Sequence, residues 1–91
     1  MTDEKILTLH PQGKSGRNVS KQSYDTIKTA MLKALKNKEF THSELFEQMN
    51  IILNRKFNGN INWYSETVKL DLEARNIIER TSDKPQKYKL K

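Results

Sequence analysis

Helical spacing of apolar residues recurs three times in the sequence, and short strand patterns precede and follow these repeats. The expected helices span residues 20–36, 42–56 and 62–75, and the expected strands are residues 5–9, 77–80 and 87–90. Each helix needs a partner for its apolar side, because a short isolated helix is marginal in water. A chain of 91 residues has room for one hydrophobic core, so all of these elements should pack as one domain, residues 1–91.

Polar residues at the expected helix ends support these boundaries. Ser20 is a favourable N-cap, and Thr41 with Glu44 forms a capping box, in which two side chains satisfy backbone N–H groups of the first turn. Asn62 is expected to cap the third helix. Asn76 follows that helix where a left-handed backbone conformation belongs, and asparagine tolerates this conformation better than most side chains.

The third helix carries two apolar faces. One face contains Trp63, Leu70 and Ala74, and the other contains Tyr64, Val68 and Leu72. We expect the helix to be buried on both sides, with Trp63 in the core, because large aromatic side chains at helical spacing usually pack inside. The alternative is that the second face forms a homodimer or partner surface.

The order of the elements, a strand, three helices and a hairpin, predicts an α+β fold of the winged-helix type. In this arrangement the helices pack on a small sheet. The C-terminal hairpin, called the wing, forms part of that sheet, and the early strand pairs with the edge of the hairpin. We expect residues 1–4 to be disordered and residues 10–19 to form a basic loop.

Several segments resemble known proteins. Residues 72–80 resemble the junction in winged-helix regulators where the recognition helix ends and the wing begins, with Asn76 in place of the usual glycine. More narrowly, the chain resembles a family of small uncharacterised bacterial winged-helix proteins. The matching residues are His10-Pro11, Gly13-Lys14, Val19, Tyr24 and the segment 63–74. The resemblance implies the winged-helix fold and brings no established activity.

Composition narrows the classes of function. The chain has no cysteine, which removes disulfides, thiolate metal sites and cysteine nucleophiles. Its first residues do not form a signal peptide, and no apolar stretch is long enough to cross a bilayer, so we expect a cytoplasmic protein. Gly13-Lys14-Ser15 matches the end of a phosphate-binding loop, but Thr8 stands where that motif requires glycine.

No catalytic or metal-binding group of residues is evident. His10 and His42 lack the spacing of metal ligands. Asp71 and Glu73 are two positions apart on a helix, so they point in different directions and cannot act as a carboxylate pair. We therefore expect neither enzyme activity nor a cofactor.

Positive charge is concentrated in two segments of this chain, whose net charge is +6. Residues 14–38 contain seven Lys and Arg against one acid, and residues 84–91 contain four Lys and no acid. Residues 39–83 are mildly acidic. Such basic patches attract anionic partners, although lysines also keep a small domain soluble.

We predict a non-enzymatic DNA-binding module, of the kind found in transcriptional regulators, with mostly electrostatic contacts. The charged side chains of the third helix sum to −1, so backbone contacts should come mainly from the first loop and the wing. The predicted contact residues are Lys14, Arg17, Lys21, Arg55, Lys56, Asn60, Asn62, Tyr64, Ser65, Lys69, Lys84 and Lys87. The alternative is a protein-interaction or homodimerising winged helix that does not bind DNA.

Overall fold

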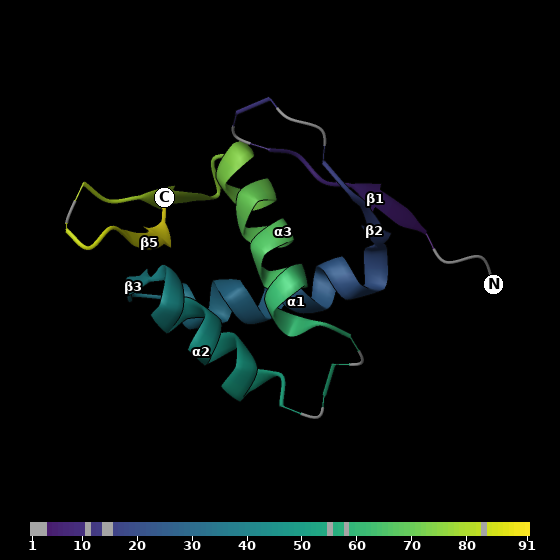
Figure 1. The fold of residues 1–91 in the computed structure, drawn as a ribbon, viewed down its shortest axis with the longest axis horizontal. Helices are drawn as coiled ribbons and strands as arrows, with labels where there is room; N and C mark the ends of the chain where they lie inside the picture. The colour runs from purple at the N-terminus through teal and green to yellow at the C-terminus, as the bar shows by residue number, and fades with distance from the viewer. Residues whose placement is uncertain (1–3, 11, 14–15, 55, 58, 83) are drawn as a thin grey trace.

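The computed structural model describes residues 4–10, 12–13, 16–54, 56–57, 59–82 and 84–91, which form three helices and five short strands. The helices are α1 (Lys21–Leu35), α2 (His42–Ile52) and α3 (Ile61–Ala74). The strands are β1 (Lys5–Leu7), β2 (Asn18–Ser20), β3 (Phe40–Thr41), β4 (Ile78–Arg80) and β5 (Lys87–Leu90). These residues form a small α+β domain with two antiparallel sheets (Figure 1). None of the helices in these ranges is long and apolar enough to cross a membrane.

The two sheets connect different parts of the chain. β1 pairs with β2, and the pairing continues beyond the strands through two hydrogen bonds between Thr8 and Arg17. The second sheet has the strand order β3-β5-β4, so β5 lies in the middle and pairs with both neighbours.

The prediction that the early strand closes the edge of the C-terminal hairpin is wrong. β1 pairs instead with β2, of which Asn18 and Val19 fall in the segment predicted to be a loop, and β3 takes the place beside the hairpin. Val19 is buried and lies opposite Ile6, so the chain pairs two apolar residues across a short connection. Closing such a short connection costs less entropy than pairing β1 with the distant hairpin.

Three predicted caps are confirmed. The Ser20 hydroxyl accepts a hydrogen bond from the Ser23 N–H at the start of α1. Thr41 and Glu44 form the capping box of α2, with donor–acceptor distances of 3.2 and 2.9 Å. Asn76 has a φ of 63°, and this left-handed residue separates α3 from β4.

Other boundaries differ from the prediction. α3 is capped by Asn60, whose side chain accepts a hydrogen bond from the Trp63 N–H at 2.9 Å, so the prediction of Asn62 as the cap is wrong. Asn60 comes first in the chain and has the extended backbone of a cap. α2 ends at Ile52, earlier than predicted, although Leu53 beyond it is still buried. Of residues 1–4, which were predicted to be disordered, 1–3 lie outside the described residues, whereas the Glu4 carbonyl accepts a hydrogen bond from the Lys21 N–H at 2.8 Å.

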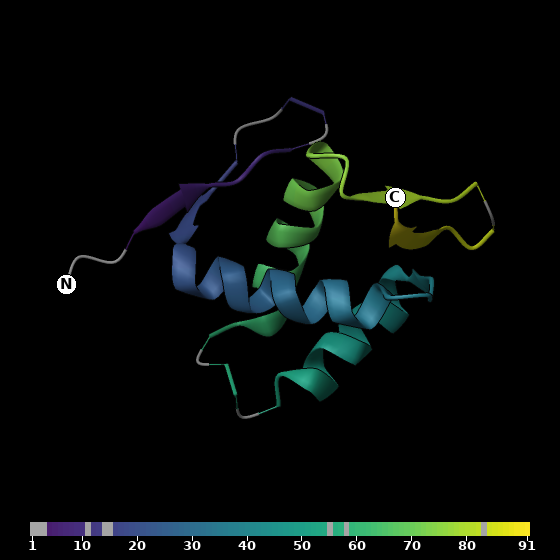
Figure 2. The ribbon, with the colours of Figure 1, turned by 180° about the vertical axis from the view of Figure 1, so that it is seen from behind.

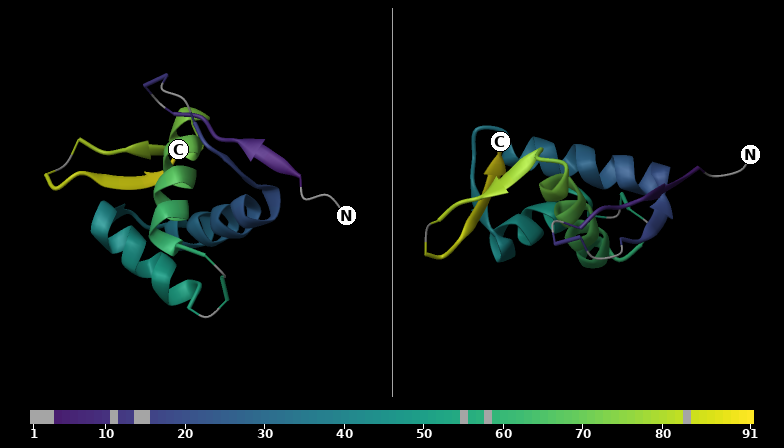
Figure 3. Two further views of the ribbon diagram at one scale, coloured as in Figure 1. Left: turned by 45° about the vertical axis from the view of Figure 1, so that its right-hand side comes forward. Right: turned by 90° about the horizontal axis from the view of Figure 1, so that it is seen from above.

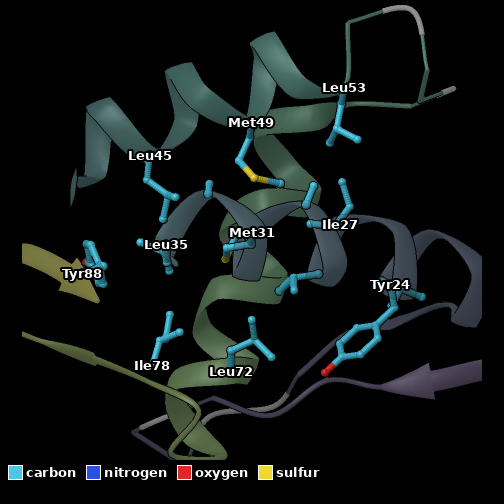
Figure 4. Close-up of a cluster of buried hydrophobic side chains, with 14 residues drawn as sticks. Tyr24, Ile27, Met31, Leu35, Leu45, Met49, Leu53, Leu72, Ile78 and Tyr88 are labelled. Atoms are coloured by element: carbon cyan, nitrogen blue, oxygen red, sulfur yellow. The ribbon is translucent and has the colours of Figure 1, made fainter. Parts of the chain in front are cut away.

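The core lies among the three helices and the hairpin (Figure 4). Val68 and Leu72 of α3 are fully buried in it, so the alternative that this side of α3 is a partner surface is wrong. Trp63 is 43% exposed, so its predicted place in the core is wrong as well. α1 and α2 both pack against α3, and Val68 and Leu72 belong to the core cluster that the three helices share, whereas Trp63 does not.

The elements that flank α3 lie on the same side of α1. α3 passes in front of α1 in Figure 1, whereas α1 is in front in the view from behind (Figure 2). The segment after β1 lies beside the C-terminal end of α3, and the hairpin extends on its other side (Figure 1). Seen from above, α3, this segment and the hairpin tip all lie on one side of α1 (Figure 3, right).

Candidate nucleic-acid interface

The outward side of α3 is the surface that the prediction places against nucleic acid. A rotation of about 100° per residue brings six of its residues to this side, which we call the α3 face: Asn62, Trp63, Glu66, Thr67, Leu70 and Glu73. Each of these residues is exposed or half-buried. The α3 face therefore combines two apolar side chains with two carboxylates, which is an unusual composition for contact with phosphates.

Lys69 was predicted to contact DNA, and this prediction is wrong. The residue is only 2% exposed, and its ammonium nitrogen lies 2.9 Å from His42 Nδ1 and 3.3 Å from the Tyr88 hydroxyl oxygen. The same nitrogen is 4.4 Å from the centroid of the Tyr88 ring, a cation–π contact. The long side chain turns toward the hairpin, and Tyr88, which is distant in the sequence, covers it.

Ser65 and Tyr64 are not free contact residues either. Ser65 is fully buried, so its predicted contact is wrong, and its hydroxyl has no hydrogen-bond partner among the described residues. Tyr64 is half-buried, and its ring meets the rings of Phe57 and Trp63 edge-on at centroid distances of 5.1 and 4.9 Å. Its neighbours therefore cover much of the surface on which a base would stack.

Asn60 and Asn62 are exposed at the N-terminal end of α3, as predicted. The oxygen of Asn60 caps the helix, and the oxygen of Asn62 accepts a hydrogen bond from Asn50 Nδ2 at 2.9 Å. These bonds fix both side chains beside a helix N-terminus, where backbone N–H groups favour a phosphate.

Each of the three carboxylates of α3 has a cation beside it. The pairs are Glu66–Lys69 at 3.4 Å, Asp71–Arg75 at 2.9 Å and Glu73–Arg80. Arg80 comes from β4, so it is not included in the charge of −1 counted along the helix. That count therefore overstates the repulsion that a phosphate would meet. Within the described ranges, no three His, Asp or Glu side chains are grouped so that they could hold a metal ion.

Three predicted contact residues are exposed cations that form no ion pair with any described residue. They are Arg17 before β2, Lys56 after α2 and Lys84 in the hairpin connection. Arg17 and Lys84 belong to the segments that flank α3 on the same side of α1 (Figure 3). Among the described residues, the predicted backbone contacts from the first loop and the wing therefore rest mainly on these two side chains.

Two of the remaining predicted contact residues form ion pairs within the domain, and two lie outside the described residues. Lys21 forms an ion pair of 3.0 Å with Asp25 on α1, and Lys87 lies 4.0 Å from Glu39. Ion pairs of this kind on the surface are weak, so a phosphate could replace the carboxylate. Lys14 and Arg55 lie outside the described residues.

Asp71 joins the segment after β1 to the helices. This fully buried carboxylate accepts hydrogen bonds from the Leu9 N–H at 2.8 Å, from the Tyr24 hydroxyl, and from Arg75 Nε at 2.9 and 3.0 Å. Burial of Tyr24, followed by its hydrogen bond to Asp71, raises the pKa of its hydroxyl above the ordinary value. The carboxylate thereby holds Leu9 against α3 and fixes the border of the α3 face.

Sequence reasoning missed this role of Asp71. A signal was present, because Arg75 follows at the i,i+4 spacing of a helical ion pair and Asp71 lies between two leucines. The partners Leu9 and Tyr24 come from distant parts of the chain, and no spacing rule connects them to α3.

We expect the free energy of unfolding to fall on mild acidification because of His42. Burial, followed by the charge of Lys69, lowers the pKa of His42, whereas Glu66 at 3.7 Å opposes this shift and Arg80 adds to it. A lowered pKa means that the unfolded chain takes up the proton first, so stability is full above about pH 6.5 and falls as the pH drops below that value.

The measurement is the urea midpoint between pH 7.5 and 5.5, above the range in which ordinary carboxylates titrate. We expect the midpoint to fall as the pH is lowered in the wild type and to fall less in His42→Gln. Because this variant keeps His10, the difference between the two proteins reports on His42 alone. Equal slopes in the two proteins would show that His42 does not cause the loss.

Comparison with known proteins places the chain in a group without an assigned role. A family model described as "Family of unknown function (DUF6958)" matches residues 5–88. No curated protein and no solved structure matches the chain.

Proposed function

Because this chain belongs to the DUF6958 family, whose function is unknown, we propose a function from its own surface: a non-enzymatic winged-helix module that binds DNA mainly through the phosphate backbone. Such modules occur in transcriptional regulators. DNA would lie across the α3 face, between the loop that carries Arg17 and the hairpin that carries Lys84.

The arrangement of the elements supports a winged-helix interpretation. α1 is followed by the short β3, then by α2, α3 and the β4–β5 hairpin, and β3 pairs with the hairpin strand β5. In a winged helix bound to DNA, the third helix faces the major groove and the hairpin reaches the backbone. α3 and the hairpin tip lie on one side of α1 here, as such an arrangement would require (Figure 3).

The charge arrangement around α3 is the observation that carries the DNA proposal. The carboxylates of the helix are paired with cations, and the exposed cations Arg17, Lys56 and Lys84 have no such partner in the described structure. Phosphates would supply the missing partners and release their own counterions, which is the main source of non-specific affinity. The apolar and acidic composition of the α3 face favours weak sequence preference.

A double substitution tests this placement. Arg17→Gln with Lys84→Gln removes one charge from each of the two segments that flank α3, and Lys33→Gln with Lys36→Gln removes two exposed charges at the C-terminal end of α1. Binding to a labelled mixed-sequence duplex is measured by fluorescence anisotropy across a salt series. We expect the first variant to bind more weakly and to reduce the slope of log affinity against log salt by about 2, whereas the control variant changes little.

Two results would contradict the proposal. Wild-type affinity that is absent at low salt, or that does not depend on salt, would exclude binding through phosphates. Equal weakening of the two variants would mean that overall charge, rather than the surface beside α3, attracts the duplex.

The exposed apolar side chains favour protein interaction as a second candidate function. Trp63 is 43% exposed and Leu9 is 44% exposed, and both lie beside the half-buried Leu70. Aromatic side chains are enriched where proteins bind one another, and a homodimer could cover this surface. Size-exclusion chromatography with light scattering distinguishes the candidates: a dimer that ignores DNA supports interaction, and a monomer that binds the duplex supports the first proposal.

A further inference from the structure

A pocket of about 340 Å³ lies between the segment after β1 and the α3 face. Its lining includes Leu9, His10 and Arg17 on one side and Trp63, Glu66 and Leu70 on the other. The volume falls within the range of sites that bind small molecules. The pocket therefore has the size of a ligand site, and its function depends on the chemistry of these walls.

Hydrogen bonds fix the wall that carries Arg17. The Thr8 N–H donates to the Arg17 carbonyl at 2.9 Å, and the Arg17 N–H donates to the Thr8 hydroxyl at 2.8 Å. Gly16 makes this approach possible, because a Cβ atom at that position would lie 1.6 Å from the Thr8 carbonyl oxygen. Leu9 is tied to Asp71 on α3. The pocket is thus held open between two anchored segments and does not need a ligand to form.

The lining offers apolar surface together with one cation that has no partner. Trp63, Leu9 and Leu70 supply apolar surface for a planar group. Arg17 forms no ion pair within the described part of the chain. A guanidinium group favours a carboxylate, to which it can donate two parallel hydrogen bonds.

Two neighbouring groups set the charge of the ligand. Glu66 also lines the pocket, and its carboxylate lies 3.4 Å from the ammonium of Lys69 and 3.7 Å from His42 Nδ1. One unpaired cation beside a paired carboxylate suits a single negative charge better than a phosphate dianion. His10 adds a donor, since its Nδ1 accepts the Gln12 N–H at 3.1 Å and a neutral ring then carries its proton on Nε2.

We propose that this pocket binds a small aromatic monocarboxylate, with the ring against Trp63 and Leu70 and the carboxylate on Arg17. The pocket shares Arg17 and part of the α3 face with the proposed DNA surface. Its binding of a carboxylate does not depend on DNA binding, and its test contains no nucleic acid. It would give the domain a small-molecule ligand held between the segment after β1 and α3.

The test uses the isotope-labelled full chain and 3-phenylpropionate as the probe. Trp63 is the single tryptophan, so its indole N–H gives one side-chain resonance that reports on the pocket. We expect this resonance and the Leu9 and Arg17 amide resonances to shift, with a roughly millimolar dissociation constant for so small a ligand. The neutral 3-phenylpropionamide should bind about tenfold more weakly, because it lacks the charge-assisted hydrogen bonds.

Matched variants connect the binding to Arg17. Arg17→Gln should weaken the binding of 3-phenylpropionate about tenfold, whereas Lys33→Gln, which removes the same charge on α1, should leave it unchanged. The amide spectrum of each variant reports whether its fold is retained. If the fold of Arg17→Gln is lost, the comparison of acid with amide in the wild type decides the question.

Three results would overturn the proposal. The first is the absence of shifts at Trp63 at a tenfold excess over the expected dissociation constant. The second is equal binding of the acid and the amide, which would mean that the pocket recognises only apolar surface. The third is tighter binding of adenosine monophosphate than of 3-phenylpropionate, which would assign the pocket to phosphate ligands instead.

Discussion

Replacement of Asp71 by alanine is expected to lower the free energy of unfolding by about 3–5 kcal/mol, the cost of breaking a buried ionic group by removing one partner. The substitution leaves the Tyr24 hydroxyl buried without its acceptor and the Leu9 N–H without its partner. It also removes the partner of Arg75. Urea unfolding monitored by circular dichroism measures the loss.

Asp25→Ala is the matched control for this prediction. Asp25 also forms an i,i+4 ion pair, with Lys21. Unlike the buried side chain of Asp71, the side chain of Asp25 is exposed. Such a pair on a helix surface contributes only about 0.3–0.5 kcal/mol. Similar losses in the two variants would mean that the buried hydrogen bonds of Asp71 contribute little, and the role assigned to this carboxylate would then be wrong.

Gly16→Ala should be the second most damaging change, with an expected loss of about 3 kcal/mol, at the upper end of the cost of overpacking. The added Cβ would lie 1.6 Å from the Thr8 carbonyl oxygen, which is backbone and cannot rotate away. The chain must therefore break the hydrogen bonds between Thr8 and Arg17. Urea unfolding measures the loss, and faster hydrogen exchange at the Thr8 and Arg17 amides would locate it.

Gly13→Ala separates crowding from backbone conformation. Gly13 has a φ of 73°, and a Cβ there meets no atom within 4 Å, so this variant carries only the strain of a left-handed residue, about 1 kcal/mol. If Gly16→Ala were no more harmful than Gly13→Ala, the close approach at Thr8 would not hold in solution.

The helices could be predicted from local signals because their causes are local. The capping box of Thr41 and Glu44 and the left-handed Asn76 depend on residues within one turn of each other, and both are confirmed. The pairing of β1 was not predictable in the same way. Strand pairing is a choice between partners, and the signal that decides it, Val19 opposite Ile6, is a single apolar residue in a segment rich in loop residues.

The candidate site was predicted less well, because the exposure of each side chain depends on distant residues. Lys69 lies at the edge of the helix side that faces the core, and the Tyr88 ring from the hairpin decides that it is buried. Trp63 has the spacing of a core residue, but it is 43% exposed and lies outside the cluster in which Val68 and Leu72 pack with residues of α1 and α2. Helical spacing identifies the faces, and only the tertiary arrangement shows which face is covered.

The bond from Leu9 to Asp71 also determines where this domain can be shortened. A chain that starts at Asn18 would keep every helix and the hairpin, yet it would open a buried carboxylate and the Tyr24 hydroxyl to water. β1 and the segment after it therefore keep water from the buried polar groups around Asp71. Fusion partners and truncations can be placed before Lys5 without uncovering these groups, but not between Lys5 and Leu9.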